Sequence, residues 1–323
     1  MPARVPSLTV RELNRALLAR QFLLKRQKIA VVDAVERLGG LQGQWAPSPY
    51  VALWSRLAGF EREQLTRAID RGDVVKATLM RATLHLVSGG EYPAYSLATM
   101  EGRFGAWRPP GGPALADLET LHKKVVTFAA KTPRTRTEIQ EFSAAHLPPG
   151  AAKNERLRSW LTWAAVATSG LVWEPSGAHF EHRQLARHVA PPPLLRKAPQ
   201  PDAAYDLVDL ARAPRPSADI AAPARFLARF DAAILGHAAP ERARILPEAF
   251  RKQVIFSAEV WQTYLVDGFV AGRWTIAVSP KEAVVELKPF KRLAKADRAA
   301  LIEEGERLVR FYAPLSKTHR VRA

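Results

Sequence analysis

The sequence contains no cysteine among its 323 residues. Without thiols the chain cannot form a disulfide, a zinc knuckle, an iron–sulfur cluster or a covalent thiol intermediate. It also has no apolar run near the roughly 18 residues that a membrane-spanning helix needs, and residues 1–10 lack the apolar core of a signal peptide. We therefore expect a cytoplasmic protein with no membrane partner.

Acidic residues are scarce relative to basic ones. Asp and Glu total 31 against 48 Lys and Arg, which gives a formal net charge of +17. Such a charge attracts polyanions such as DNA, RNA or an acidic membrane surface, although a coding bias toward arginine would produce the same excess. Hydrophobic residues make up 47% of the chain, so we expect two or three folded units rather than disorder.

Residues 1–110 follow the order of a winged helix, in which helices precede paired short strands. Helices are predicted over residues 9–21, 30–38, 50–57, 62–71 and 90–102. The first begins with a capping box, since Thr9 can cap the helix while Glu12 reaches back. Two prolines and a glycine make residues 41–49 a poor regular element. Arg81, Thr83 and His85 alternate with apolar residues, so residues 74–87 are predicted as a half-buried strand with these side chains on one face.

Residues 114–192 repeat this order, with predicted helices over 115–130, 137–145 and 152–168. A second capping box, Thr135 with Glu138, starts the middle helix. Strands at 171–174 and 179–182 are predicted to form a two-stranded wing. In winged helices the third helix usually enters the major groove of DNA and the wing meets the backbone or the minor groove. The basic residues at these two places are therefore candidate phosphate contacts, with a solvated helix face as the alternative for each. They are Lys153, Arg156, Arg158 and Arg183.

Residues 202–323 differ in pattern. A helix is predicted over 202–213, after a proline-rich linker, and strands follow between 262 and 287. Asp267-Gly268 predicts a hairpin turn, because type I′ turns need positive φ, and residues 294–309 predict a closing amphipathic helix. The fold class is therefore α+β: mostly helical, tandem winged-helix units followed by a small β-rich domain closed by a helix.

Three stretches together carry a family resemblance. They are Gly40-Leu-Gln-Gly-Gln44 with residues 49–57, then Arg81-Ala-Thr-Leu-His-Leu86, and then residues 230–237 with 265–274. In this order they resemble the winged-helix DNA-binding family that includes the AlkZ and YcaQ types of DNA glycosylase, over roughly residues 8–311. Membership would imply several winged helices around a basic channel and excision of bulky or crosslinking N-alkylated purines from double-stranded DNA.

The resemblance also implies a catalytic signature of Gln, an aliphatic residue, and then Gln or Asp. Gln42 and Gln44 fall on its two polar positions, while Gly43 is smaller than the usual middle residue. Family members typically carry a third winged helix before the stretch that begins at Phe230. Residues 213–225 leave little room for one, so that unit is expected to be abbreviated, with residues 202–213 as its remnant.

Two glutamines make chemical sense for one class of substrate only. A carboxamide takes up no proton near pH 7, so it cannot act as a general base, but it can orient water by hydrogen bonding. A purine alkylated at N3 or N7 already carries positive charge and leaves as a neutral base without acid catalysis. Gln42 and Gln44 would therefore suit cationic lesions, and the alternative is that they satisfy backbone groups in a Pro- and Gly-rich turn.

Other polar residues have predicted roles of lower specificity. Arg81 could hold a phosphate, His85 a phosphate or the lesion, and Trp45 could stack on DNA or belong to the core. The pair Asp231 and His237 is interpreted as architectural, and Asp267 is assigned to the hairpin turn. No phosphate-binding glycine loop or metal-ligand spacing is present, so neither a cofactor nor a metal is expected.

Three functions fit these observations. The first is a monofunctional DNA glycosylase, the second is a non-catalytic DNA-binding protein or transcription regulator, and the third is a module that binds protein or RNA. A regulator would be expected to dimerise, but the sequence has no coiled-coil heptads and no ligand domain. We expect a monomer, located at the nucleoid if it binds DNA.

Overall fold

The computed structural model describes residues 8–110, 114, 118–147, 154–181, 187–189 and 215–323. The chain forms two compact units that interleave along the sequence. The winged-helix unit consists of residues 31–47 and 62–204, and the sheet unit of residues 1–30, 48–61 and 205–323. The predicted domain boundaries at 110–114 and 192–202 stay a prediction.

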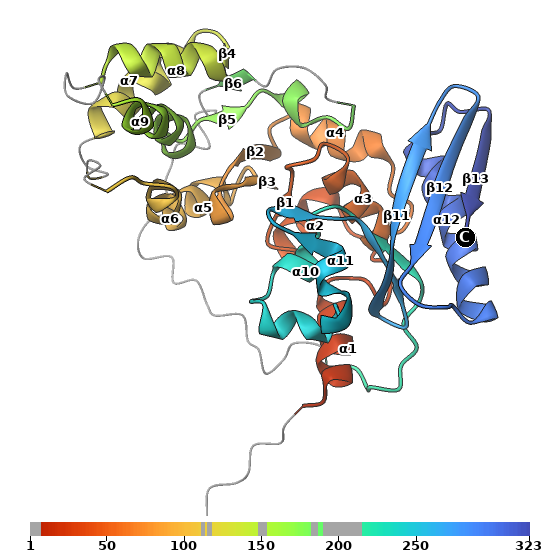
Figure 1. Ribbon diagram of the computed structural model, residues 1–323. Coiled ribbons are helices and arrows are strands. Elements are labelled where there is room, and N and C mark those ends of the chain that lie inside the picture. The colour runs from red at the N-terminus through yellow and green to blue at the C-terminus, as the bar shows by residue number, and fades with distance from the viewer. Residues whose placement is uncertain (1–7, 111–113, 115–117, 148–153, 182–186, 190–214) are drawn as a thin grey trace, which may run out of the picture. The chain divides into compact units, whose positions relative to one another are not determined.

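Two repeats of one topology follow each other along the chain (Figure 1). The first has the order α2 (Val31–Arg37), β1 (Leu41–Gln42), α3 (Ser48–Arg56), α4 (Arg62–Asp70), β2 (Val74–Thr78) and β3 (Leu84–Ser88). The second has the order α7 (Glu119–Ala130), β4 (Arg134–Thr135), α8 (Arg136–Ala145), α9 (Glu155–Thr168), β5 (Val172–Trp173) and β6 (Arg187–Val189). Helices α5 (Tyr92–Ala98) and α6 (Met100–Gly105) connect the repeats, and α3 belongs to the sheet unit.

The two small sheets have the same strand order. In each repeat the third strand lies between the other two, which gives β1-β3-β2 and β4-β6-β5 with antiparallel neighbours. Helix, strand, helix, helix and a two-stranded wing are the elements of a winged helix, so the prediction of tandem winged-helix units is confirmed. Both predicted capping boxes are present as well, at Thr9 with Glu12 and at Thr135 with Glu138.

Three local predictions for this unit were wrong. Residues 74–87 form a hairpin rather than one strand, because Arg81 and Ala82 have left-handed φ angles of 53° and 54° and turn the chain between β2 and β3. The wing partner of β5 is β6 at residues 187–189 and not residues 179–182, of which 182 lies outside the described residues. Residues 41–42, predicted to be irregular, form the edge strand β1.

Apolar side chains of three helices form the core of the second repeat. Trp160 and Leu161 of α9 pack with residues of α7 and α8, while the Trp160 indole N–H donates to the Ala106 carbonyl at 3.1 Å. Tyr92 and Val172 belong to a separate cluster around β2 and β3. The second cluster joins β5 of the second repeat, through Val172, to the β2–β3 sheet of the first.

The sheet unit is built on five strands in the order β13-β12-β11-β10-β7. Their bounds are Arg225–Leu227 for β7, Thr263–Val266 for β10, Phe269–Val278 for β11, Glu282–Pro289 for β12 and Thr318–Arg322 for β13. The closing helix α12 (Lys295–Tyr312) lies along this sheet (Figure 1), as predicted. The remaining elements are α1 (Val10–Arg20), α10 (Ala232–Leu235), α11 (Arg251–Val254), β8 (Ile255–Phe256) and β9 (Glu259–Val260).

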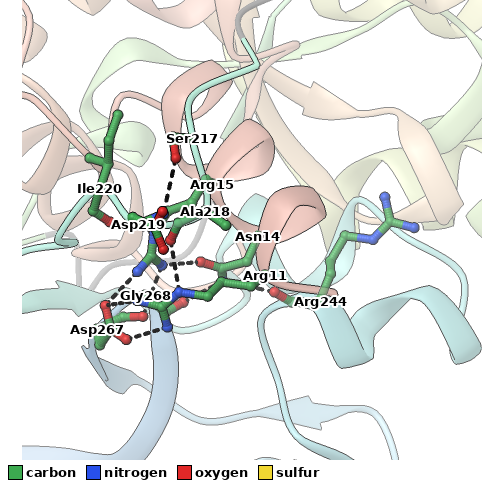
Figure 2. Close-up of polar contacts among 10 residues, drawn as sticks. All are labelled: Arg11, Asn14, Arg15, Ser217, Ala218, Asp219, Ile220, Arg244, Asp267 and Gly268. Atoms are coloured by element: carbon green, nitrogen blue, oxygen red, sulfur yellow. Dashed lines mark hydrogen bonds and ion pairs between the residues drawn. The ribbon is translucent and has the colours of Figure 1, made fainter. Parts of the chain in front are cut away.

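The hairpin turn at Asp267 is fixed by two arginines of α1 (Figure 2). Arg11 donates to Asp267 Oδ2 at 2.6 Å, and the fully buried Arg15 donates to Oδ1 and, at 3.0 Å, to the Asp267 carbonyl. Hydrogen bonds from these guanidinium groups hold the pKa of Asp267 below its usual value, against the opposing effect of burial. Asp267 is therefore a turn residue that anchors the hairpin to the N-terminal helix.

The neighbouring Gly268 is required for two separate reasons. Its φ of 83° favours glycine, and a Cβ there would lie 2.5 Å from Asn14 Oδ1 and 2.6 Å from an Arg15 nitrogen. The same two arginines also hold the segment that precedes β7, since Arg11 donates to the Ala218 carbonyl and Arg15 to the Ile220 carbonyl, both at 2.7 Å (Figure 2). The predicted remnant helix over residues 202–213 lies outside the described residues.

A buried ion pair confirms the architectural interpretation of Asp231. Its carboxylate accepts two bonds from Arg56, at 2.6 and 3.0 Å, and one from the backbone N–H of Ala233 at the start of α10. Asp231 and Arg56 are both almost fully buried. Removing one partner of such a pair strands the other charge and costs about 3–5 kcal/mol. His237 does not share these contacts; its ring is half-buried.

Within the described residues, no helix is both long enough and apolar enough to cross a membrane. The same part of the chain contains no cluster of three or more histidine and acidic side chains that could hold a metal ion.

Candidate active site

The strand β1 places the Gln42-Gly43-Gln44 motif against β3. Two glycines with positive φ, Gly39 at 71° and Gly40 at 86°, turn the chain from α2 into β1. Leu41 and Gln42 then pair with Leu86 and His85, and the Gly43 N–H continues the ladder by donating to the Leu84 carbonyl at 2.8 Å. The motif therefore starts on a sheet edge and leaves it where β1 ends.

Close packing explains the glycine at position 43. A Cβ on Gly43 would lie 2.5 Å from Leu86 Cδ1 and 3.5 Å from Lys76 Cε. Leu86 and the Lys76 side chain thus occupy the space that a larger middle residue would need. Position 43 thus departs from the aliphatic pattern, and Leu86 fills the space that the usual side chain would occupy.

Both glutamine side chains are held through their carbonyl oxygens. Gln42 Oε1 accepts from the Arg81 guanidinium at 3.1 Å, and Gln44 Oε1 accepts from the Leu84 backbone N–H at 3.2 Å. A carbonyl oxygen has two lone pairs, so one can be used for positioning while the other accepts from water. Gln44 is exposed and Gln42 half-buried, so both lie where a ligand from solvent can approach.

Arg81 reaches Gln42 from the turn between β2 and β3. The turn is closed by backbone hydrogen bonds from Leu79 to Thr83 at 2.9 Å and from Ala82 to Leu79 at 3.0 Å. Non-glycine residues in the left-handed region store strain and often occur at functional sites. Because Arg81 is in this turn, it does not share a strand face with His85, and that prediction is corrected.

His85 lies beneath the motif and not on its surface. Its side chain is buried on β3, and burial lowers its pKa to about 4, with the positive charge of Arg81 acting in the same direction. Its Nδ1 lies 3.0 Å from the Thr83 carbonyl. The ring is therefore neutral at physiological pH, and the predicted DNA contact of His85 would require it to become exposed.

A buried lysine underlies the same motif. Lys76 is 4% exposed, its ammonium donates to the Gly177 carbonyl at 3.1 Å, and it lies 3.9 Å from the centre of the Trp173 ring. Burial lowers its pKa to about 8, so it stays largely protonated at pH 7. Because Gly177 and Trp173 belong to the second repeat, Lys76 connects the wing region of that repeat to the floor of the motif.

Sequence reasoning missed Lys76, although one signal was present. Lys76 interrupts an otherwise apolar run in β2, Val74-Val-Lys-Ala77, in which every residue is buried. A charged residue at a fully buried strand position needs a specific partner. That partner lies more than ninety residues along the chain, so local pattern could not identify it.

The other predicted site residues lie elsewhere. Trp45 follows the motif directly and is half-buried, while Arg156 and Arg158 are exposed on the first turn of α9. Lys153 and Arg183 lie outside the described residues. The structure thus brings Gln42, Gln44 and Arg81 together at one edge, with His85 below them.

Comparisons with known proteins identify a family from its sequence model and, separately, a similar fold. The family model described as "DNA glycosylase AlkZ-like" matches residues 35–208 and 188–311. The fold is similar to that of the DNA glycosylase AlkZ from Streptomyces sahachiroi, with a TM-score of 0.71 and 19% sequence identity, over 98% of this chain and 100% of that one. No curated protein sequence matches the chain.

Proposed function

Because the chain belongs to the AlkZ-like DNA glycosylase family, we propose that it excises N-alkylated, positively charged purines from double-stranded DNA. Water would be the nucleophile, oriented by Gln42 and Gln44. The observation that carries this proposal is the pair of anchored carboxamides at the open edge of β1, each held by one hydrogen bond to its Oε1.

The Gln44 contact with a backbone N–H is the one expected if the glutamines only satisfy backbone groups, whereas the Gln42 contact with Arg81 supports a positioning role. The Leu84 N–H fixes the Gln44 carboxamide, and Arg81 fixes that of Gln42, so neither has to be ordered when a water binds. A nucleophile that is already held in the attacking geometry loses less entropy on the way to the transition state, so the reaction is faster. Water would add to C1′ of the deoxyribose as the C1′–N bond breaks, and the base would leave with the bonding electrons.

The chemistry of the two carboxamides limits the substrate. Neither carboxamide takes up the proton that water loses, and the neighbouring His85 is buried. Protons would pass to bulk solvent after attack, which is adequate when the leaving group is already cationic and departs as a neutral base. Unmodified purines need acid assistance, so we expect the site to leave them intact.

Binding of DNA would rest on cations at two places. Arg81 lies beside the motif and is the candidate for the phosphate next to the lesion. Arg156 and Arg158, together with Lys153 and Arg183, are the candidates on the second repeat, and Trp45 is a candidate for stacking in the space that an extruded base leaves.

A single-turnover excision assay tests the proposal. The substrate is duplex DNA with one N7-alkylguanine, and free base is measured for the wild type, Gln42→Ala and Gln44→Ala. We expect each variant to be slower by about 100-fold or more, because a nucleophile that is no longer oriented loses rate on this scale, while duplex binding is unchanged.

Two further variants sharpen the result. Gln140→Ala, the same substitution on α8, serves as the matched control and should leave excision unchanged. Gln44→Glu keeps an acceptor for the Leu84 N–H and for water, so it should retain most of the activity. Tight binding without release of free base, across small and bulky adducts, would leave a non-catalytic DNA-binding protein instead.

A further inference from the structure

A hollow of about 550 Å³ lies in the winged-helix unit, on a part of it that the proposed chemistry does not use. Three tryptophans line it: Trp107, which follows α6, and Trp160 and Trp163 of α9. Its volume falls within the roughly 300–1,000 Å³ of small-molecule sites in proteins. Tryptophan-rich hollows offer flat surfaces on which a planar ring can stack.

Trp107 is exposed to solvent and has a strained backbone conformation. Its side chain is 71% exposed, and its φ of 57° lies in the left-handed region, which bulky residues rarely adopt. The indole contacts Trp163 edge to face, with ring centres 5.0 Å apart. By contrast, Trp160 is buried and bonded to the Ala106 carbonyl, so it forms the floor. Strained backbone conformations cluster at ligand-binding and other functional sites, which makes the exposed Trp107 a candidate ligand contact.

Charged groups at the rim identify the kind of ligand. Arg136, at the start of α8, and Arg156, on α9, both line the hollow, and neither forms an ion pair with a carboxylate within the described residues. Glu155 is also at the rim. These side chains match a ligand that has a flat ring to stack on the indoles, an anionic group for the arginines and an amino group for the carboxylate.

We infer that this pocket binds an unpaired nucleotide of DNA. The base would stack on Trp107 and Trp163, its phosphate would meet Arg136 and Arg156, and Glu155 could accept from an exocyclic amino group. Stacking on aromatic side chains is available to every base, so the pocket would read the absence of pairing and not the sequence. The inference requires no excision chemistry at Gln42 and Gln44.

Fluorescence anisotropy on two unmodified DNA probes tests it. One probe is a fully paired duplex, and the other is the same duplex with a single unpaired adenine, which has the exocyclic amino group that Glu155 would accept from. We expect the wild-type protein to bind the second probe at least about fivefold more tightly, the lower end of the effect of base–aromatic stacking. Trp107→Gly, which suits a positive φ and removes the ring, should abolish this preference while affinity for the paired duplex is kept.

Two variants serve as controls. Trp107→Phe restores an aromatic face and should recover the preference, whereas Leu97→Ala, at an exposed apolar residue of α5, should leave it unchanged. Circular dichroism verifies folding of each variant. Equal affinity of the wild type for the two probes, or a preference that survives Trp107→Gly, overturns the inference. Tighter binding of an unpaired ribonucleotide strand than of its DNA counterpart overturns the assignment to DNA.

Discussion

The two winged-helix repeats share a strand order but differ at the step from their first strand to their second helix. In the second repeat α8 begins at Arg136, the residue that directly follows β4. In the first, residues 43–47 separate β1 from α3 and contain Gly43 and Gln44. The proposed chemistry therefore depends on residues inserted into a topology that the second repeat has without them. Both repeats have the third helix, α4 in the first and α9 in the second, which winged helices usually place in the major groove of DNA.

Both repeats also bury a neutral histidine on their third strand. His85 on β3 pairs across from Gln42, and His188 on β6 pairs across from Arg134. Burial lowers the pKa of each to about 4. The second repeat contains another, the half-buried His122 of α7, whose pKa is lowered by burial to about 4. The repeats should therefore respond unequally to acid.

Acidification is expected to give the largest effect, and to affect the second repeat more. Unfolding lets each ring take up a proton below its unfolded pKa near 6.5, so stability is full above that pH and is lost as the pH falls toward 4. At 1.36 kcal/mol per pKa unit, each ring contributes about 3 kcal/mol at most across the interval. Hydrogen exchange by mass spectrometry, corrected for intrinsic rates, should show peptides of residues 119–189 losing protection before those of residues 62–105.

The sheet unit is the comparison for this measurement, and its half-buried His237 also has a lowered pKa. Its Asp267 has a lowered pKa, so the stability that it contributes is lost only at pH values below its ordinary pKa of 3.8. His188→Gln should reduce the pH dependence of the second repeat to the part that His122 contributes. Equal loss in both repeats between pH 6.5 and 4 would mean that the buried rings do not govern acid stability.

Features that depend on residues close together in the sequence could be predicted. Capping boxes at Thr9 and Thr135, and the Asp267-Gly268 turn, rest on residues within a few positions of each other, and the structure has all three. The strand β13 was missed, because residues 318–322 have no apolar run and pair in parallel with a strand more than thirty residues away.

The candidate site shows the same limit. Gln42 and Gln44 could be singled out by the family pattern, yet the turn that brings Arg81 to Gln42 was taken for a strand. Alternating polarity cannot distinguish a continuous strand from two short strands joined by left-handed residues, because the periodicity is nearly the same. Lys76 and Gly177 come together only through tertiary packing.

Enlarging Gly43 should have an intermediate effect on the first repeat. Gly43→Ala places a Cβ 2.5 Å from Leu86 Cδ1, and overpacking of this kind costs about 1–3 kcal/mol. Displacement of the motif should also slow excision. Urea denaturation and the single-turnover assay measure the two effects, and the double variant Gly43→Ala/Leu86→Val, which removes the clashing methyl, should recover part of both.

Gly90→Ala is the matched control for this substitution. No atom outside its chain neighbours lies within 4 Å of a Cβ at Gly90, so the added methyl should be tolerated. If Gly43→Ala were as mild as Gly90→Ala, the close contact with Leu86 would not be what favours glycine in the motif.

The smallest expected effect comes from removing the N-cap of α8, the helix that begins directly after β4 in the second repeat. Thr135 is both the last residue of β4 and the N-cap of α8, where its hydroxyl accepts from the Glu138 N–H at 3.2 Å. Thr135→Ala should cost about 1 kcal/mol, since a lost cap leaves helix N–H groups unsatisfied. The loss should appear as faster hydrogen exchange in α8, with excision unchanged. Thr9→Ala removes the same capping box from α1 in the sheet unit and should loosen that helix instead; a fall in excision with Thr135→Ala alone would show that the second repeat also shapes the site.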